Sequence, residues 1–434
     1  MQKYKYNSVT RFLRKMRAQY IQRKYGDPSR DMTVIGVTGT DGKSTTAELI
    51  YQQLSASHIK TGLISTIGGK IGEKVFDTGL HTSTPSSEAV YRAFSEMKKE
   101  GITTVVLEQT SHGLDQQRTS GIRLKLAVFT NITHEHLDYH GTFEAYRRAK
   151  CRIIDMVVEN GYVVINRDDP SWEYITAYAA NSKKNLHIVY YTRMQTDLHI
   201  ADKAIKLYKA EHIEANENGQ KFDIHLSNVK FSLELQLPGL YNVSNALAAV
   251  SAAVSIEVPL AGIVKGIQQA KNIPGRFIVL QKTPFTVIVD FAHTPNAIRE
   301  ILSLLSTRLN TGRLIVVFGS AGERDASKRL LMGKEVSNLA DVIIITAEDP
   351  RREKFTDIAE MIVQGIDKTK FVEKSNLFVI ESREEAIKTA ITGIAKEGDI
   401  VIMLGKGHEQ SMCIGTTEYP WDEVTVVKKY IYQK

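Results

Sequence analysis

The spacing of apolar residues predicts alternating strands and helices through the first part of the chain. Thr33–Val37 has the pattern of a short apolar strand, and Thr45–Leu54 has a helical one. Further strand-like runs at 105–107, 126–129 and 162–165 lie between amphipathic segments. This alternation is typical of a mostly parallel sheet covered by helices.

A second alternation begins after residues 272–277. The intervening stretch, 185–236, is less regular and favours antiparallel strands, and an alanine-rich buried helix is expected after the loop "LPGLYN". Helices are then predicted near 296–306, 328–338 and 384–395, between five apolar strands with the sequences TVIVDF, LIVVF, DVIIIT, LFVI and DIVIML. The predicted fold class is α/β, with a second doubly wound domain that begins close to Gly275.

Length and composition agree with this division. A chain of 434 residues exceeds one ordinary core, and 42% apolar with 24% charged residues is typical of a globular protein. Cys151 and Cys413 are far apart in the chain, which argues against a disulfide scaffold and fits the reducing cytoplasm. No apolar run approaches the ~20 residues of a membrane span. We expect a basic helical extension at 1–31, a central domain at 32–275 and a C-terminal domain at 276–434.

The formal charge of +7 is concentrated at the N-terminus. Residues 1–31 carry many lysines and arginines against Asp27 and Asp31, whereas the rest of the chain is nearly neutral. A binding site for small anions therefore fits better than a nucleic-acid surface. The favoured interpretation of this segment is a solvated helix that packs on the protein through Phe12, Leu13, Met16, Tyr20 and Ile21.

The stretch "VTGTDGKSTT" (37–46) has the features of a phosphate-binding loop between a strand and a helix. Gly39 and Gly42 allow a tight turn, Lys43 would reach the outer phosphates and Ser44 would ligate Mg²⁺. The full Walker A pattern requires glycine at position 37, where this chain has valine, so the loop is a variant. A polyphosphate substrate is the expectation.

Two further segments carry candidate metal ligands. Glu108 comes at the carboxyl end of an apolar strand, the edge where open α/β sheets bind ligands. The segment 130–150 also follows a strand and concentrates histidines and acids at His134, Glu135, His136, Asp138 and His140. An oxygen-rich site beside a phosphate loop favours Mg²⁺ over zinc.

Together these segments resemble the successive motifs of the Mur ligases, in particular MurE. The resemblance runs in order from about residue 33 to 427 through "GVTGTDGKSTT", "LEQTSHGLDQQR", "TNITHEHLDYHGT", "GLYNVSNALAA", "DFAHTPNA", "FGSAGERDASKR", "EDPR" and "GKGHE". It implies a P-loop central domain followed by a Rossmann-like C-terminal domain. It also implies a ligase that uses ATP to convert the carboxylate of UDP-N-acetylmuramoyl-L-alanyl-D-glutamate into an acyl phosphate, which the amine of a diamino acid then attacks.

The resemblance further implies roles for individual residues, with ATP and Mg²⁺ as cofactors. Lys43, Glu108, His136 and Lys150 match the catalytic positions, and Lys150 matches a lysine that is carbamylated in the family. The matched metal positions are Ser44, Glu108, His136 and Lys150. The matched nucleotide positions are Gly39, Thr40, Asp41, Gly42, Lys43, Ser44, Thr45, Asn242, Asn245, Arg276, Asp290 and His293.

Two substrate sites follow from the same resemblance. The positions matched for the muramoyl acceptor are Ser83, Thr84, Ser111, Gln116 and Arg118, and those for the incoming amino acid are Arg324, Glu348, Asp349, Arg351, Gly405 and Glu409. Enzymes that add meso-diaminopimelate have "DNPR" where this chain has "EDPR". The added negative charge at Asp349 would weaken a preference for diaminopimelate over the more cationic L-lysine, while the retained Arg351 would support it. Meso-diaminopimelate is the expected substrate, with L-lysine as the alternative.

Family members also have a separate N-terminal domain for the uridine diphosphate, and a basic segment of about thirty residues stands before the first strand here. The expectation is that Arg11, Arg14, Arg17 or Arg23 holds this end of the acceptor, that a partner subunit does so, or that the acceptor is modified. A monomer is expected. Two other interpretations stay open: a ligase of the folylpolyglutamate or cyanophycin type, and a non-catalytic ATP-binding regulatory module.

Overall fold

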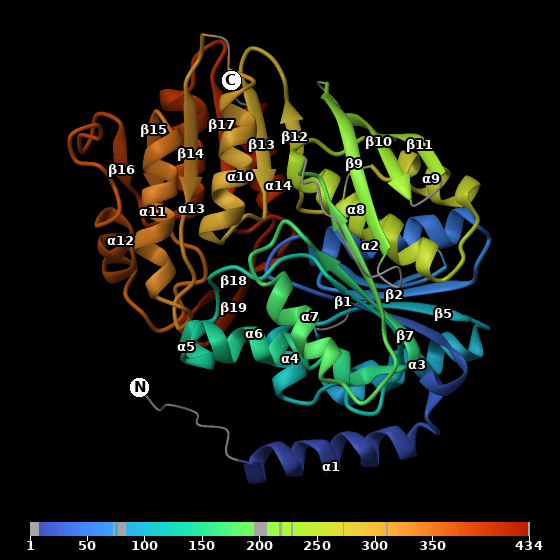
Figure 1. The fold of residues 1–434 in the computed structure, drawn as a ribbon. Helices are drawn as coiled ribbons and strands as arrows, with labels where there is room; N and C mark the ends of the chain where they lie inside the picture. The colour runs from blue at the N-terminus through green and yellow to red at the C-terminus, as the bar shows by residue number, and fades with distance from the viewer. Residues whose placement is uncertain are drawn as a thin grey trace. The chain divides into compact units, whose positions relative to one another are not determined.

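The computed structural model describes residues 8–72, 74–76, 84–194, 206–216, 219–226, 229–271, 273–309 and 311–432. The chain forms two compact units (Figure 1). Unit 1 comprises Met1–Thr133 and Gly141–Lys271, and unit 2 comprises His134–His140 and Asn272–Lys434. Each unit contains a sheet with helices on both faces, so the predicted α/β fold class is confirmed.

Unit 1 is built on an eleven-stranded sheet in the order β11-β10-β9-β8-β7-β6-β1-β5-β2-β3-β4. Its central strands are parallel, and their apolar residues are buried on both faces as expected for a parallel sheet. These strands are β1 (Thr33–Thr38), β2 (Thr61–Ser65), β5 (Thr104–Glu108), β6 (Leu124–Phe129), β7 (Val157–Asn166) and β8 (His187–Thr192).

Antiparallel strands extend this sheet at its two ends. They are β3 (Gly68–Ile71) and β4 (Lys74–Phe76) at one end, and β9 (Lys206–Ala215), β10 (Gln220–Leu226) and β11 (Val229–Leu235) at the other. The antiparallel pairing of β9, β10 and β11 agrees with the prediction for the less regular stretch. However, β8 pairs in parallel with both β7 and β9, so that part of the stretch belongs to the parallel sheet.

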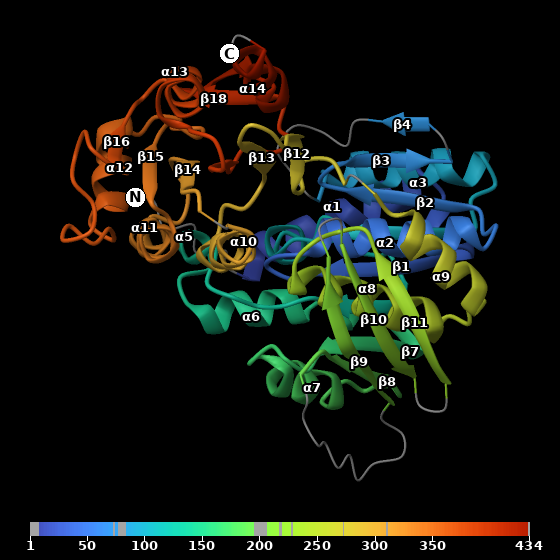
Figure 2. The ribbon, with the colours of Figure 1, turned by 90° about the horizontal axis from the view of Figure 1, so that it is seen from above.

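Helices cover both faces of this sheet (Figure 2). One face carries α2 (Lys43–Ala56), the alanine-rich α8 (Leu240–Ser255) and α9 (Leu260–Gln269), which contact one another. Small side chains allow α8 to be almost entirely buried. The other helices of unit 1 are α1 (Ser8–Lys24), η1 (Pro28–Asp31), α3 (Ser87–Lys99), α4 (Ser111–Asp115), α6 (Phe143–Cys151), η2 (Ile154–Met156) and α7 (Trp172–Ala180).

The predicted packing of α1 is wrong for most of its apolar residues. Ile21 is buried as expected, but Phe12, Leu13, Met16 and Tyr20 are exposed. Helical periodicity identifies an apolar face, but it cannot say whether that face contacts the protein. Along the described part of the chain, the helices lack the length and apolar character that crossing a bilayer demands.

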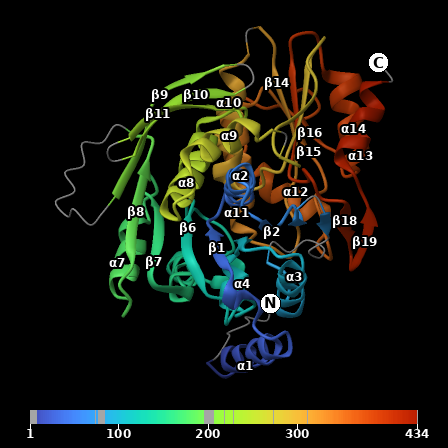
Figure 3. The same ribbon diagram turned by 90° about the vertical axis from the view of Figure 1, so that its right-hand side faces the viewer.

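Unit 2 has a six-stranded sheet in the order β12-β13-β17-β14-β15-β16, seen from another side in Figure 3. The five predicted strands are present as β13 (Thr286–Asp290), β14 (Leu314–Phe318), β15 (Val342–Ile345), β16 (Leu377–Val379) and β17 (Ile400–Leu404), all parallel. Antiparallel β12 (Ile278–Gln281) was not predicted, nor was the hairpin of β18 (Ser411–Ile414) and β19 (Thr417–Pro420).

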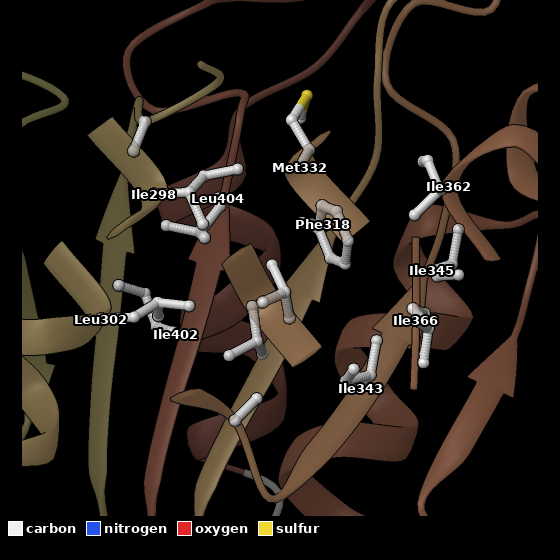
Figure 4. Packing of buried hydrophobic residues seen from close by; sticks show 14 of the residues in the cluster. Ile298, Leu302, Phe318, Met332, Ile343, Ile345, Ile362, Ile366, Ile402 and Leu404 are labelled. Carbon is white, nitrogen blue, oxygen red and sulfur yellow. The ribbon is translucent and has the colours of Figure 1, made fainter. Parts of the chain in front are cut away.

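Two apolar layers hold the unit 2 sheet between its helices. Figure 4 shows one of them, in which Phe318 and Ile345 from the strands meet Met332 and Ile362 from the helices. This layer involves α10 (Pro295–Ser306), α11 (Ser327–Leu339) and the unpredicted α12 (Phe355–Val363); the opposite layer involves α13 (Arg383–Lys388), η3 (Thr389–Ile394) and α14 (Glu423–Ile431). Helix α5 (Leu137–His140) also belongs to unit 2.

Candidate active site

The loop between β1 and α2 has the geometry of a phosphate-binding turn. Gly39 and Gly42 have φ values of +154° and +80°, and a Cβ at Gly42 would lie 2.2 Å from Oδ1 of Asn245. The N–H groups of Thr40 and Asp41 donate to the carbonyl and the side-chain oxygen of Asn131, at 2.8 and 2.9 Å. These contacts fix the loop ahead of the N-terminus of α2, where helix N–H groups and the helix dipole favour an anion.

Ser44 and Glu108 converge beside this loop. The Ser44 hydroxyl donates to Oε2 of the fully buried Glu108 at 2.9 Å. Thr66 also donates to Glu108, through its backbone N–H at 3.0 Å and its hydroxyl at 2.8 Å. A hydroxyl and a carboxylate are oxygen ligands of the kind that Mg²⁺ prefers, so these residues fit that ion. The metal-binding role remains a prediction.

Lys150 is buried in the same region and is not a plain surface lysine. Its Nζ donates to the carbonyl of Gly39 at 2.5 Å and lies 4.7 Å from the ring centroid of Tyr146. The Tyr146 hydroxyl in turn lies 2.8 Å from Oγ1 of Thr40. Lys150 thus supports the phosphate loop directly.

Asn242 and Asn245 lie at the start of α8, next to the same loop. The side chain of Asn245 donates to Asn242 at 3.1 Å, and Asn242 donates to the carbonyl of Pro238 at 2.7 Å. Both side chains are buried and have fixed orientations. The remaining loop residues, Lys43 and Thr45, are in the first turn of α2, and Nζ of Lys43 donates to the Thr40 carbonyl at 2.8 Å.

Three of the predicted acceptor residues, Ser111, Gln116 and Arg118, follow β5, and Thr84 contacts this segment from the chain before α3. Arg118 donates to the carbonyl of Thr84 at 2.6 Å, and Gln116 accepts two further bonds from the same guanidinium at 3.0 and 2.8 Å. The buried Ser111 hydroxyl has no hydrogen-bond partner within the part of the chain that the structure describes. A buried hydroxyl without a partner is costly, and a substrate group would satisfy it. Ser83 lies outside the described residues.

Three of the predicted nucleotide contacts lie around the carboxyl end of β13, where Asp290 is its last residue. Asp290 accepts from the N–H groups of Phe277 and Ala292, each at 2.7 Å, and the Arg276 guanidinium lies 4.7 Å from the Phe291 ring. Burial raises the pKa of Asp290, although Arg276 opposes the rise. Burial, reinforced by the charge of a nearby lysine, lowers the pKa of His293 to about 3, so this ring is neutral at pH 7.

The histidine-rich segment 134–140 belongs to unit 2. Asp325 accepts from the N–H of Leu137 at 2.9 Å, and Nε2 of His134 lies 2.9 Å from the Ser327 hydroxyl. In the described ranges, no three His, Cys, Asp or Glu side chains form a group able to hold a metal ion. His136 belongs to unit 2, whereas the other predicted catalytic residues belong to unit 1. Their common metal site remains a prediction.

The "EDPR" segment contains a charge pair that bears on amino-acid choice. Lys406 is fully buried, and its Nζ donates to Asp349 at 2.8 Å and to Glu409 at 2.6 Å. Although burial lowers it, these two carboxylates raise the pKa of Lys406 above its ordinary value. Arg351 donates to the carbonyl of Gly322 at 2.7 Å, and its other terminal nitrogen lies 3.6 Å from Asp349. The charge of Asp349 is therefore compensated within the protein.

Glu348 and Gly405 are in close contact in this region. A Cβ at Gly405, where φ is +103°, would lie 2.2 Å from Oε2 of Glu348. That oxygen is buried and accepts no hydrogen bond from any described residue. The sixth predicted residue, Arg324, is exposed on the loop that follows β14. All six residues predicted for the amino acid are thus in unit 2, at the carboxyl ends of its strands.

Comparison with known proteins identifies the family. Residues 37–253 match the model of the Mur ligase middle domain, and residues 275–407 match that of the Mur ligase, glutamate ligase domain. The UDP-N-acetylmuramyl-tripeptide synthetase of Roseiflexus sp. is 37% identical over 418 residues, which cover 93% of this chain and 79% of that protein. The chain belongs to the Mur ligase family.

Other Mur ligases support the resemblance to MurE. A UDP-N-acetylmuramoyl-L-alanyl-D-glutamate--2,6-diaminopimelate ligase of Clostridium acetobutylicum is 35% identical over 410 residues, covering 94% of this chain and 80% of that protein. A solved structure of a ligase with this activity in its name matches with a TM-score of 0.63 at 30% identity, covering 98% of this chain and 83% of that chain. The predicted recognition is confirmed, and the chain is a ligase of this family.

Sequence reasoning missed several polar residues of this Mur ligase. Thr66 donates hydrogen bonds to Glu108. It comes directly after β2, and no sequence motif marks it. Lys328 lies within "FGSAGERDASKR" and Lys406 within "GKGHE". Their position inside these motifs was the only sequence feature that could have pointed to a role. Lys328 is buried and donates to Glu135 at 3.1 Å and to the His293 carbonyl at 2.9 Å. Lysines are rarely buried, so composition alone argued against both.

The buried Glu348 predicts a pH dependence of stability. Burial raises its pKa from 4.5 to about 7, despite the opposing charges of Lys328, Arg383 and Lys406. The folded state therefore binds the proton more tightly, and this stabilisation is complete below the unfolded pKa and is lost as pH rises through about 7. A shift of this size corresponds to about 3 kcal/mol. We expect the difference in unfolding free energy between wild type and Glu348→Gln to fall by this amount from pH 4.5 to 8.

Chemical denaturation at a series of pH values measures this difference. The exposed Glu381 offers a matched control, since Glu381→Gln should leave the pH profile of unfolding unchanged. A Glu348→Gln profile parallel to that of wild type would contradict the assignment.

Proposed function

We propose that this Mur ligase joins meso-diaminopimelate to UDP-N-acetylmuramoyl-L-alanyl-D-glutamate at the expense of ATP, in peptidoglycan precursor synthesis. The names of its relatives support this activity. The observation that carries it furthest is the turn after β5. Glu108 faces Ser44 of the phosphate loop there, and Ser111, Gln116 and Arg118 follow within ten residues. The residue proposed to hold Mg²⁺ beside the phosphate loop and the residues proposed to bind the acceptor thus lie on one segment.

In the proposed reaction, an oxygen of the acceptor's terminal carboxylate attacks the γ-phosphorus of ATP, and ADP leaves. The amine of the incoming amino acid then attacks the carbonyl carbon of this acyl phosphate, loses a proton and displaces inorganic phosphate. Bound Mg²⁺ would neutralise part of the phosphate charge. Ser44 and Glu108 would hold it. Lys43 and the first turn of α2 would stabilise the charge on the transferred group, and Arg118 would orient the acceptor.

The choice of amino acid is assigned to unit 2. Meso-diaminopimelate differs from L-lysine by a distal carboxylate, which a planar arginine recognises well. Arg351 is tied to the Gly322 carbonyl at one nitrogen, and Lys406 offsets the negative charge of Asp349. This compensation supports diaminopimelate over a more cationic substrate. One charged hydrogen-bond pair is worth ~1.5–3 kcal/mol, or roughly tenfold or more in discrimination.

A phosphate-release assay tests the proposal directly. We expect release to require both UDP-muramoyl dipeptide and an amino acid, with turnover of meso-diaminopimelate roughly tenfold or more above that of L-lysine. Arg351→Ala should remove this preference, whereas Arg352→Ala, at the adjacent exposed arginine, should retain it. Better turnover of L-lysine would refute the amino-acid assignment, and amino-acid-independent ATP hydrolysis would favour the regulatory module.

The proposal also covers the setting of the enzyme. Cys151 and Cys413 are both free and buried, which is compatible with a reducing cytoplasm. We propose that the enzyme acts there as a monomer on small-molecule substrates. How the uridine diphosphate end of the acceptor is held belongs to the same proposal, with the arginines of α1 or a partner subunit as the candidates.

A further inference from the structure

Helix α1 has two apolar faces, and only one of them contacts the protein. Ala18 and Ile21 are 1% and 4% exposed. Gln22, next to them, donates to the carbonyl of Gly121 at 3.3 Å. At the end of the helix, Lys24 donates to Glu88 of α3 at 2.7 Å. Figure 1 shows α1 at the margin of unit 1, beside α3.

The second face is exposed. Phe12, Met16 and Tyr20 are spaced by four residues and therefore lie along one side of the helix, with Leu13 next to them. Their exposed fractions are 60%, 49% and 70%, and that of Leu13 is 60%. Positions two residues apart are rotated by about 200°, so Met16 points almost opposite to the buried Ala18. We call Phe12, Leu13, Met16 and Tyr20 the outer stripe.

The charge of α1 is of one sign. The helix contains no acidic residue. Its basic residues are Arg11, Arg14, Lys15, Arg17, Arg23 and Lys24. Arg17, Arg23 and Lys15 are exposed, and none of them forms an ion pair with a described residue. An apolar stripe among basic side chains is complementary to a surface that is both apolar and anionic.

We propose that the outer stripe of α1 docks this enzyme on a bilayer that contains anionic lipids. The helix would lie in the plane of the interface, with the rings of Phe12 and Tyr20 between the headgroups and the arginines beside lipid phosphates. Amphipathic helices with large apolar residues and Lys/Arg-rich flanks bind membranes in this way. Each Lys or Arg near such a surface adds electrostatic attraction.

Two observations favour a bilayer over a nucleic acid or a protein groove. Duplex phosphates would pair with the cations but leave the four large apolar side chains, which are 49–70% exposed, in water. A protein groove receives a helix through its single apolar face, but α1 already uses one face to contact α3 and presents the other as an exposed apolar surface. A fluid, flat interface accommodates such a surface.

Vesicle flotation with the full chain tests the proposal. We expect the protein to float with vesicles of phosphatidylcholine and phosphatidylglycerol at low salt, and to remain in solution with phosphatidylcholine alone. The double variant Phe12→Ser/Tyr20→Ser should require about tenfold more lipid for half-maximal binding. Arg17→Glu/Arg23→Glu should raise the lipid needed for half-maximal binding by at least about tenfold. Raised salt should weaken the binding of the wild type in the same way.

Matched controls separate the stripe from general surface properties. Val75→Ser/Val229→Ser removes two exposed valines elsewhere, and Lys368→Glu/Lys374→Glu reverses two exposed charges on unit 2; both variants should bind vesicles like wild type. Circular dichroism should show that every variant is folded, and Phe12→Ser/Tyr20→Ser should retain ligation of the soluble substrates.

Three outcomes would overturn the proposal. The first is wild-type protein that fails to float at millimolar lipid. The second is equal binding of wild type and Phe12→Ser/Tyr20→Ser. The third is no vesicle binding together with self-association that this variant abolishes, which would identify the outer stripe as a protein contact. Because ligation is measured separately in solution, failure here leaves the proposed reaction unaffected.

Discussion

Glu108→Gln is expected to lower kcat/KM for ligation at least ~100-fold while the protein remains folded. The substitution keeps the shape of the side chain but removes the charge that would hold Mg²⁺ beside Ser44. The two bonds from Thr66 fix this carboxylate in a fully buried position, so another carboxylate cannot easily replace it. The lost activity corresponds to about 3 kcal/mol of transition-state stabilisation.

Steady-state phosphate release at a series of Mg²⁺ concentrations measures this effect. Glu48 is a matched control, because it is also a largely buried glutamate of unit 1 but pairs with Lys70 at 2.6 Å. Glu48→Gln should cost some stability and leave kcat/KM nearly unchanged. If the two variants retained similar activity, or if Glu108→Gln kept its wild-type Mg²⁺ dependence, the assignment of Glu108 to the metal would fail.

Lys406→Met is expected to destabilise the protein by about 3–5 kcal/mol. The lysine is fully buried between Asp349 and Glu409, and its removal takes the bridging cation from two carboxylates, with Arg351 remaining 3.6 Å from Asp349. Unpaired buried charge costs far more than the loss of an exposed ion pair. Turnover of meso-diaminopimelate should also fall, because the uncompensated Asp349 would repel the distal carboxylate of that substrate.

The double variant Lys406→Met/Asp349→Asn separates charge from packing. It restores neutrality next to Arg351 and should recover a large part of both the unfolding free energy and the turnover. Lys370→Met is the matched control: this exposed lysine donates to the carbonyls of Ser337 and Ala340 and forms no ion pair with a described residue, so its removal should cost less than about 1 kcal/mol. Denaturant unfolding measures the stabilities. Equal destabilisation by the single and double variants would show that charge compensation is not the role of Lys406.

The sequence alone allowed most of the parallel strands of both units to be located, although the central strand β2 was missed. The apolar runs that became β1, β5, β14 and β17 are buried on both faces of parallel sheets, so each is continuous and recognisable in isolation. Short elements at the edges were harder to find. Strand β12 pairs through one edge only, and part of its surface stays exposed, so its pattern is weak.

The functional residues also fall into those that the sequence predicts and those that it does not. The phosphate loop was predictable because a strand, two glycines and a Gly-Lys-Ser sequence are contiguous, and local geometry follows from local sequence. The partners of Glu108 and Asp349 were not predictable, because Thr66 and Lys406 lie 42 and 57 positions away in the chain. Only the folded chain brings such residues together.

The sequence by itself therefore determined the α/β class, most of the parallel strands, the phosphate loop and the family. Each depends on patterns that extend over a few residues or on motifs in a fixed order. The tertiary structure decided which charges are buried, as for Lys150, Lys328 and Lys406, and which face of α1 contacts the protein. Burial and charge pairing depend on contacts between distant segments, and a helix with two apolar faces has the same periodicity whichever face is covered.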